Sequence, residues 1–168
     1  MEFTRLRAWQ ESDAADVVHA INNKEVLNNL RDGIPYPYSL ADAESFIRSR
    51  LDVDKNEAFA WAITDNGRVI GSIGIFRKGN IHRLTAEMGY YLAEDFWGKG
   101  IATEAVREAV SYVFLHTDIV RVYAEPFARN LASCRVLEKA GFTFEGVLRK
   151  NAIKNGEILD MRLYSIVR

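Results

Sequence analysis

The chain has 168 residues, of which 48% are apolar and 27% charged, a balance typical of a single globular domain. Lys and Arg number 22 against 23 Asp and Glu, and this near-neutral balance excludes a general attraction to nucleic acid or anionic membranes. The single cysteine, Cys134, excludes an internal disulfide and a cysteine zinc cluster. The longest apolar run, residues 58–63, is far shorter than the roughly 20 residues of a membrane span. We therefore expect one cytoplasmic domain over residues 1–168, with no nucleic-acid or membrane partner.

The first part of the chain predicts one short strand and two helices. The apolar residues Phe3 and Leu6 near the start of the chain are read as part of a short strand. Ser12 is a suitable N-cap for a weak helix that follows it. An irregular, proline-containing stretch at residues 31–39 precedes a second helix, over residues 40–51, whose apolar side chains share one face.

The middle of the chain changes to strand periodicity. Residues 60–64 and 69–76 read as strands, and the Asn66-Gly67 pair between them is the strongest short signal of a hairpin. A further strand is expected over residues 83–92. Together these segments predict an antiparallel meander.

From Ile101 onward, apolar pairs recur at helical spacing and predict an amphipathic helix. A strand rich in β-branched residues follows at 119–125. A strand–helix–strand crossover normally makes its two strands parallel and right-handed. Asn130 is a natural N-cap for a helix over 131–140, and two strands over 142–148 and 157–167 close the chain. The expected fold class is α/β: one mixed sheet with an antiparallel N-terminal meander and two central parallel strands, flanked by helices.

The turn before the long helix is the most informative segment, and it reads Trp97-Gly98-Lys99-Gly100-Ile101-Ala102. A helix start exposes unpaired N–H groups and the positive end of the peptide dipole, and glycines let an anion approach the backbone. The segment therefore predicts a phosphate site, although an ordinary turn explains the same residues. A Rossmann dinucleotide site is disfavoured, because the strand before these glycines ends a meander and Thr103 stands where the third glycine would be.

These residues resemble the signatures of a known family. Residues 86–92 (AEMGYYL) and 97–105 (WGKGIATEA) resemble the acetyl-coenzyme A signature of the GNAT N-acetyltransferases, and 130–142 (NLASCRVLEKAGF) is similar to that family's second signature. The segments 144–149 (FEGVLR) and 35–38 (PYPY) resemble the branch that acetylates N-termini of bacterial ribosomal proteins. The resemblance covers nearly the whole chain.

The resemblance implies a fold in which two central parallel strands, here 83–92 and 119–125, separate after a short pairing. The pantetheine arm of acetyl-CoA would lie in that opening, and its pyrophosphate would rest on the amides of the glycine turn. The residues implied in binding acetyl-CoA are Tyr90, Leu92, Trp97, Gly98, Lys99, Gly100, Ile101, Ala102, Thr103, Asn130 and Ser133.

The same resemblance suggests a direct transfer of the acetyl group to a primary amine. We expect Glu87 to act as the general base, the backbone N–H near Tyr90 to stabilise the oxyanion, and Ser133 to donate to the departing sulfur. An ordinary solvated carboxylate at Glu87 and an ordinary serine in the helix remain open alternatives. Three further residues are expected to line the acceptor pocket: Arg31, Tyr36 and Tyr38. A rigid turn whose tyrosines pack on the surface of the sheet explains the same segment equally well.

Two positions depart from the family pattern. Trp97 stands where Gln or Arg is frequent, and Leu137 stands where many members have a tyrosine proposed as the general acid. Ser133, or less favourably Tyr164, would have to supply that proton. Cys134 has the spacing of a packed helix face and is expected to be structural.

The sequence predicts an acetyl-CoA-dependent enzyme with no metal, since its three histidines lie far apart along the chain. The expected acceptor is a protein N-terminal α-amine, as in the ribosomal branch. A small amine such as a polyamine, amino acid or amino sugar stays open as the acceptor, and so does a non-catalytic acyl-CoA sensor. We expect a monomer or a homodimer.

Overall fold

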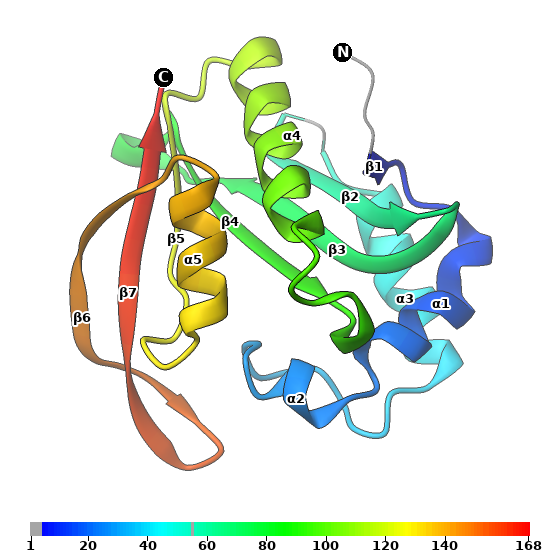
Figure 1. The fold of residues 1–168 in the computed structure, drawn as a ribbon. Helices are drawn as coiled ribbons and strands as arrows, with labels where there is room; N and C mark the ends of the chain where they lie inside the picture. Colours follow the sequence, from blue (N-terminus) through cyan, green and yellow to red (C-terminus); the bar gives the residue numbers. More distant parts are fainter. Residues whose placement is uncertain (1–4, 55) are drawn as a thin grey trace.

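The structure is a computed structural model, and it describes residues 5–54 and 56–168 (Figure 1). The predicted residue Phe3 lies outside these ranges. In chain order the elements are β1 (Leu6–Arg7), η1 (Glu11–Asp13), α1 (Ala14–Ile21), α2 (Lys24–Leu27), α3 (Leu40–Leu51), β2 (Ala58–Asp65), β3 (Arg68–Arg77), η2 (Asn80–His82), β4 (Thr85–Leu92), η3 (Glu94–Phe96), α4 (Ile101–His116), β5 (Arg121–Ala124), α5 (Leu131–Lys139), β6 (Thr143–Lys154) and β7 (Glu157–Val167).

One mixed sheet organises the domain, with the strand order β1-β2-β3-β4-β5-β7-β6 over the described residues. Strands β1 to β4 form the expected antiparallel meander, and β4 pairs with β5 in parallel. Helices α4 and α5 cover one face of the sheet, and α1 and α3 cover the other (Figure 1). The predicted fold class is confirmed.

Each face of the sheet has its own apolar core. Under α4 and α5, the fully buried side chains include Ile73, Val106 and Leu137. Under α1 and α3, Val17 and Ile47 are buried against the opposite face. Within the described ranges, no helix is long and apolar enough to cross a membrane.

Most local predictions agree with the structure. Helix α3 spans the predicted residues, with Ser39 as its N-cap, and α4 begins at Ile101 as expected. Asn66 and Gly67 both take positive φ values, 47° and 83°, which is the backbone that a two-residue hairpin turn requires. Asn130 caps α5 by accepting a hydrogen bond from the Ser133 backbone N–H.

Three local predictions are wrong. Ser12 is not the N-cap of α1: it lies inside the short helix η1, and Asp13 takes the cap position, where its carboxylate also pairs with Arg7. Helix α2 was not predicted, because four residues are too short to show a helical period. Strand β6 continues to Lys154 rather than ending near residue 148, through a polar stretch and a register shift between Leu148 and Ala152 that hide the alternation of a strand.

The two central parallel strands pair only briefly. Residues 85–87 of β4 face residues 121–123 of β5, and β5 ends one residue later. Strand β4 continues to Leu92, paired with β3 on its other edge. The edge of residues 88–92 that faces away from β3 therefore has no strand pairing with β5, and its N–H and C=O groups need other partners. This divergence is the opening that the family resemblance implies.

Candidate functional site

The glycine turn lies beside this opening, at the start of α4. Gly98 and Gly100 have φ values of 73° and 81°, a left-handed backbone that favours glycine. Among the described residues, no heavy atom lies within 4 Å of a Cβ built on either one. Lys99 is exposed, with its Nζ 5.0 Å from the Phe96 ring centroid. The turn thus presents open space and a nearby ammonium to any anion that approaches the first amides of α4.

The Trp97 side chain is 43% exposed, but its indole N–H is hydrogen-bonded to the main chain of β4. Its indole Nε1 donates a hydrogen bond to the Leu92 backbone oxygen at 2.8 Å. The indole thereby satisfies one carbonyl at the end of β4 and fixes the path of the turn. At this position a Gln or Arg would offer a polar contact on the phosphate side, so the departure from the family pattern has a structural role here.

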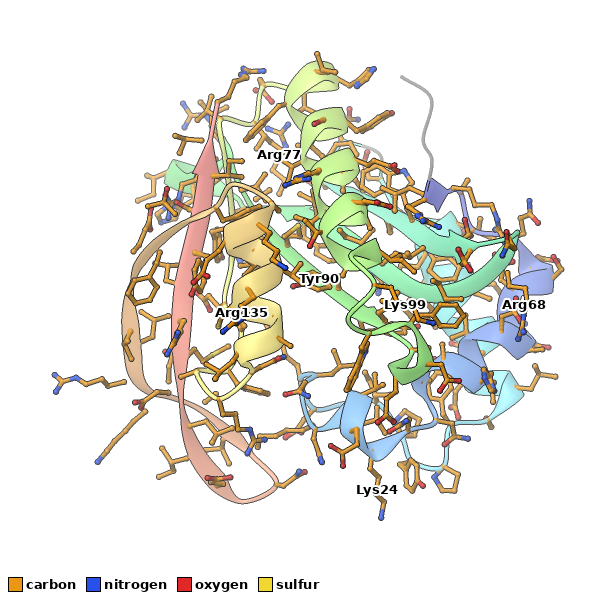
Figure 2. All side chains as sticks on the ribbon, in the orientation of Figure 1. Lys24, Arg68, Arg77, Tyr90, Lys99 and Arg135 are labelled. Atoms are coloured by element: carbon orange, nitrogen blue, oxygen red, sulfur yellow. The ribbon has the colours of Figure 1, made fainter. Side chains whose placement is uncertain are left out.

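Tyr90 and Ser133 form a hydroxyl pair on the α4/α5 side of the sheet. Their side-chain oxygens lie 2.8 Å apart, and Ser133 is held in the first turn of α5, where its N–H donates to the Asn130 side chain at 3.1 Å. Burial raises the pKa of Tyr90 above its ordinary value, so the phenol stays protonated and can donate. Figure 2 shows Tyr90 between α4 and α5, with Lys99 on one side and Arg135 on the other.

Glu87 lies on the opposite face of β4, in a cluster of charged groups. Its side chain is 17% exposed and pairs with Arg31 and, at 3.2 Å, with Lys78. The Tyr123 hydroxyl donates to the same carboxylate at 3.3 Å. Burial acts to raise the pKa of Glu87, but Arg31 and Lys78 together outweigh it and hold that pKa below its ordinary value. Glu87 is therefore ionised and doubly paired.

Glu125 is a candidate site residue that the sequence analysis did not assign. It follows the end of β5, two residues beyond Tyr123, whose register partner on β4 is Glu87. Burial raises the pKa of Glu125, and the nearby charge of Glu87 adds to that rise. Alternate residues of a strand share a face, so the two-residue spacing from Tyr123 is the signal that could have revealed it.

The three residues expected to line the acceptor pocket have different surroundings in the structure. Arg31 reaches the Glu87 carboxylate as described above. Tyr38 is 7% exposed and belongs to the core beneath α1 and α3. Tyr36 is 52% exposed, with the Lys24 Nζ 5.3 Å from its ring centroid. Of the three, Arg31 is the residue for which the structure gives a contact with the charged cluster.

The remaining candidates are core residues. Cys134 and Leu137 are buried on the sheet side of α5, as their spacing predicts. Tyr164 is 1% exposed, and its hydroxyl donates to Glu138 at 2.9 Å. Burial raises the pKa of Tyr164 to about 12. In the described part of the chain, no group of three or more His, Cys, Asp or Glu residues is arranged to hold a metal ion.

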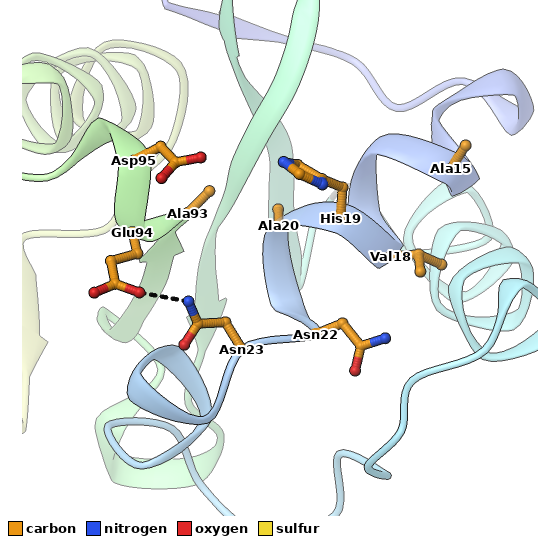
Figure 3. A pocket seen from close by; sticks show the side chains of 9 residues that line it. All are labelled: Ala15, Val18, His19, Ala20, Asn22, Asn23, Ala93, Glu94 and Asp95. Carbon is orange, nitrogen blue, oxygen red and sulfur yellow. Dashed lines mark hydrogen bonds between the residues drawn. The ribbon is translucent and has the colours of Figure 1, made fainter.

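A separate cavity of about 480 Å³ lies between α1 and η3 (Figure 3). His19, Asn23, Glu94 and Asp95 line it, and the Asn23 side chain donates to Glu94 at 2.6 Å. None of the predicted site residues lines this cavity. The candidate site is therefore the divergence of β4 and β5, rather than this hollow.

Comparison with known proteins agrees with this geometry. Residues 4–143 match the family model described as the acetyltransferase (GNAT) domain. The chain belongs to the GNAT acetyltransferase family. Two relatives are from Bacillus subtilis: the probable N-acetyltransferase YjcK, 40% identical over 71% of this chain and 66% of that relative, and the uncharacterized N-acetyltransferase YoaA, 34% identical over 97% and 92%.

Solved structures of this GNAT fold are also similar over most of their length. The microcin C7 self-immunity acetyltransferase MccE, in complex with acetyl-CoA and AMP, has a TM-score of 0.83 at 27% identity and covers 97% of this chain and 91% of its own. RimL, a ribosomal L7/L12 α-N-protein acetyltransferase in complex with coenzyme A, has a TM-score of 0.86 at 24% identity, with coverages of 98% and 94%. The present chain is an N-acetyltransferase of the same family.

Proposed function

We propose that the protein transfers an acetyl group from acetyl-CoA to the α-amine at the N-terminus of a protein. The observation that carries this proposal is the brief pairing of β4 with β5 beside the glycine turn, with hydroxyls on one face and carboxylates on the other. We also propose that the transfer takes place in the cytoplasm.

The residues at the divergence suit the donor. The unpaired edge of residues 88–92 offers main-chain groups to the amides of pantetheine, in the manner of an added strand. The first amides of α4, with Gly98 and Gly100 before them, suit a pyrophosphate. The complex of MccE with acetyl-CoA supports this assignment for a chain of the same fold and 27% identity.

The chemistry requires a neutral amine, a polarised carbonyl and a protonated leaving group. The amine nitrogen forms a bond to the acetyl carbon, and the bond between that carbon and sulfur breaks. A backbone N–H near Tyr90 would stabilise the negative charge on the carbonyl oxygen. The Ser133–Tyr90 hydroxyl pair supplies the proton to sulfur, because the two oxygens are hydrogen-bonded and Ser133 is held at the start of α5. A proton from solvent water restores the pair once coenzyme A has left, and the proton on the carboxylates returns to solvent.

The amine of the acceptor loses its proton on the face of β4 opposite to Tyr90, where Glu87 and Glu125 lie. We propose that Glu87 receives the ammonium and removes its proton, directly or through water. Glu125 is the better resting place for that proton, since burial and the Glu87 charge raise its pKa. The two carboxylates therefore act as one proton-accepting unit.

A protein N-terminus is the acceptor that this arrangement serves best. An α-amine has a pKa of about 7.7–8.0, so about a tenth of it is neutral at pH 7, whereas lysine, near 10.4, is neutral in well under a thousandth. Glu87, whose pKa lies below its ordinary value, is a weak base and suits the less demanding amine. The RimL structure supports the same acceptor class for a chain of this fold.

A small polyamine is the second candidate acceptor. Two carboxylates beside the opening, Glu87 and Glu125, suit a substrate with more than one positive charge. The spermidine N(1)-acetyltransferase of Escherichia coli is 25% identical over 91% of this chain and 80% of its own length. This candidate predicts turnover of spermidine at least as fast as turnover of any peptide.

Thiol release from acetyl-CoA tests the proposal and its alternatives together. The panel contains peptides that begin with Ala or Ser, the same peptides with a blocked N-terminus, spermidine, an amino acid and an amino sugar. We expect release only with free N-terminal peptides. Release with spermidine alone would favour the polyamine reading, and thermal stabilisation by acetyl-CoA without release would favour a non-catalytic sensor.

Two substitutions test the catalytic assignment. Glu87→Gln and Ser133→Ala should each lower the rate by about 10²-fold or more, the usual contribution of a general acid or base. Ser49→Ala and Glu44→Gln are matched controls on α3, where the Ser49 hydroxyl donates to the Phe46 carbonyl and Glu44 pairs with Arg48. If the site variants stay within about twofold of the wild type, as the controls should, these residues do not perform the transfer.

A further inference from the structure

The cluster of charged groups around Glu87 consists of Glu87, Glu125, Arg31 and Lys78. One of its two cations, Arg31, comes from a distant part of the chain. Arg31 follows α2 and pairs with Glu87 on β4, a separation of 56 residues in sequence. Its side chain is 68% exposed, whereas the Glu87 side chain is 17% exposed. The guanidinium therefore approaches a half-buried carboxylate from the solvent side, the direction from which an acceptor would arrive.

The backbone around Arg31 is held independently of this ion pair. Asp32 pairs with Lys154 at 2.8 Å, and the Lys154 side chain, at the end of β6, is only 9% exposed. The Asn28 carbonyl accepts from the Arg129 guanidinium at 3.2 Å, and the Asn28 side chain accepts from Asn155 at 3.0 Å. Residues 28–32 are thus fixed to the β6–β7 hairpin at both ends, and the Arg31 side chain can move while its backbone stays in place.

The charges of the cluster already balance without a substrate. Arg31 and Lys78 act on both Glu87 and Glu125, so two cations oppose two carboxylates. A substrate ammonium that joined this set would leave a positive charge unmatched in a half-buried site, which is unfavourable. If the ammonium replaces the guanidinium on Glu87, the balance is kept. Arg31 is the cation that can leave, because it is more exposed than Lys78, which is 42% exposed.

We propose that Arg31 is a displaceable internal cation, which occupies on Glu87 the place that the ammonium of the acceptor takes during binding. This inference rests on the proposed function. It adds that Arg31 keeps the acceptor site electrically neutral when no substrate is bound. Amine binding breaks the Arg31–Glu87 pair and sends the guanidinium into solvent, and release of the acetylated product, which carries no charge, restores the pair. Arg31 therefore tunes acceptor affinity without taking part in the transfer.

Steady-state kinetics of Arg31→Gln, with a peptide that begins with Ser as acceptor, test the inference. Exposed ion pairs are weak, so removal of the competing guanidinium should lower the KM for the peptide by about two- to fivefold and leave the KM for acetyl-CoA unchanged. Arg31→Lys keeps a cation and should resemble the wild type. Arg68→Gln is the matched control, since Arg68 is 67% exposed, pairs with Asp16 and lies far from α5 in Figure 2.

Methylguanidinium provides a readout that a structural role for Arg31 would not change. It should inhibit Arg31→Gln competitively with the peptide at millimolar concentration and inhibit the wild type several-fold less. A peptide KM that rises or stays unchanged in Arg31→Gln overturns the inference, and so does equal inhibition of the two enzymes.

A binding experiment separates this inference from the proposed function. In ¹⁵N-labelled wild-type protein, the Arg31 Nε resonance, assigned by its loss in Arg31→Gln, should shift as the same peptide is titrated, and an N-terminally acetylated peptide should leave it unmoved. A wild type that releases no thiol with any amine refutes the proposed function. An Arg31 resonance that does not respond to the free peptide refutes the displacement of Arg31, whether or not turnover occurs.

Discussion

Replacement of Gly100 by alanine separates the stability of the glycine turn from its binding role. Gly100 has a φ of 81°, and the left-handed backbone costs a residue with a Cβ roughly 1–2 kcal/mol. Among the described residues nothing lies within 4 Å of the added Cβ, so no steric term is added to this cost. For a chain of this size, about 1–2 kcal/mol lowers the Tm by roughly 2–8 °C.

The effect on donor binding should be larger than this stability loss. The Cβ would project into the open space before the first amides of α4, where the pyrophosphate is proposed to rest. Hydrogen bonds to a charged group contribute about 1.5–3 kcal/mol each, so loss of one weakens coenzyme A binding by about 10- to 100-fold. Isothermal titration calorimetry with coenzyme A measures this loss, and urea denaturation without ligand measures the stability.

Gly67→Ala is the matched control for this experiment. Gly67 has a φ of 83° and equally open surroundings, but it lies in the β2–β3 hairpin. Both variants should lose similar stability, and only Gly100→Ala should lose coenzyme A affinity. Equal loss of affinity in the two variants, or unchanged affinity in Gly100→Ala, would refute the assignment of the pyrophosphate to this turn.

Three further measurements test the site and the core. The Glu87 charge raises the pKa of Glu125, so Glu87→Gln should lower that pKa and move the acidic limb of the residual kcat/KM profile to lower pH; a limb that stays in place would show that Glu125 does not titrate in the reaction. Leu137 is fully buried, and Leu137→Ala should destabilise the protein by about 2–5 kcal/mol in urea denaturation, whereas a loss below about 1 kcal/mol would contradict its place in the core. Arg121 lowers the pKa of Glu145 to about 2 from its usual 4.5. A lowered pKa in the folded state adds stability above pH 4.5, and this stability is lost as the pH falls toward 2. Between pH 5 and pH 3, Glu145→Gln should therefore lose less unfolding free energy than the wild type.

Local patterns in the sequence predicted the elements to which the proposed pyrophosphate site belongs. The apolar stripe that begins at Ile101, the two glycines before it and the Asn130 cap are all contained in short segments. The helix or turn that each segment forms depends on backbone geometry within a few residues. Hydrophobic period and capping preferences therefore predict it without knowledge of the rest of the fold. The same reason explains the success at the Asn66-Gly67 turn.

The acceptor side depended on contacts between distant segments. Arg31, Lys78, Glu87 and Glu125 come from four separate parts of the chain, and no spacing in the sequence relates them. The sequence analysis named Glu87 as the general base and Arg31 as a residue of the acceptor pocket, but it did not predict that they form an ion pair. It placed Tyr38 in the acceptor pocket and left open that the tyrosine packs on the sheet, and the Tyr38 ring is 7% exposed in the core beneath α1 and α3.

The sequence by itself predicted the long helices α3, α4 and α5 and the Asn66-Gly67 turn, because capping residues and period are local signals. The tertiary structure decided where β4 and β5 separate, because their pairing over residues 85–87 and 121–123 is a register between segments far apart in the chain. It also decided the charge balance around Glu87. Long-range register and burial set both features, and neither leaves a periodic signal along the chain.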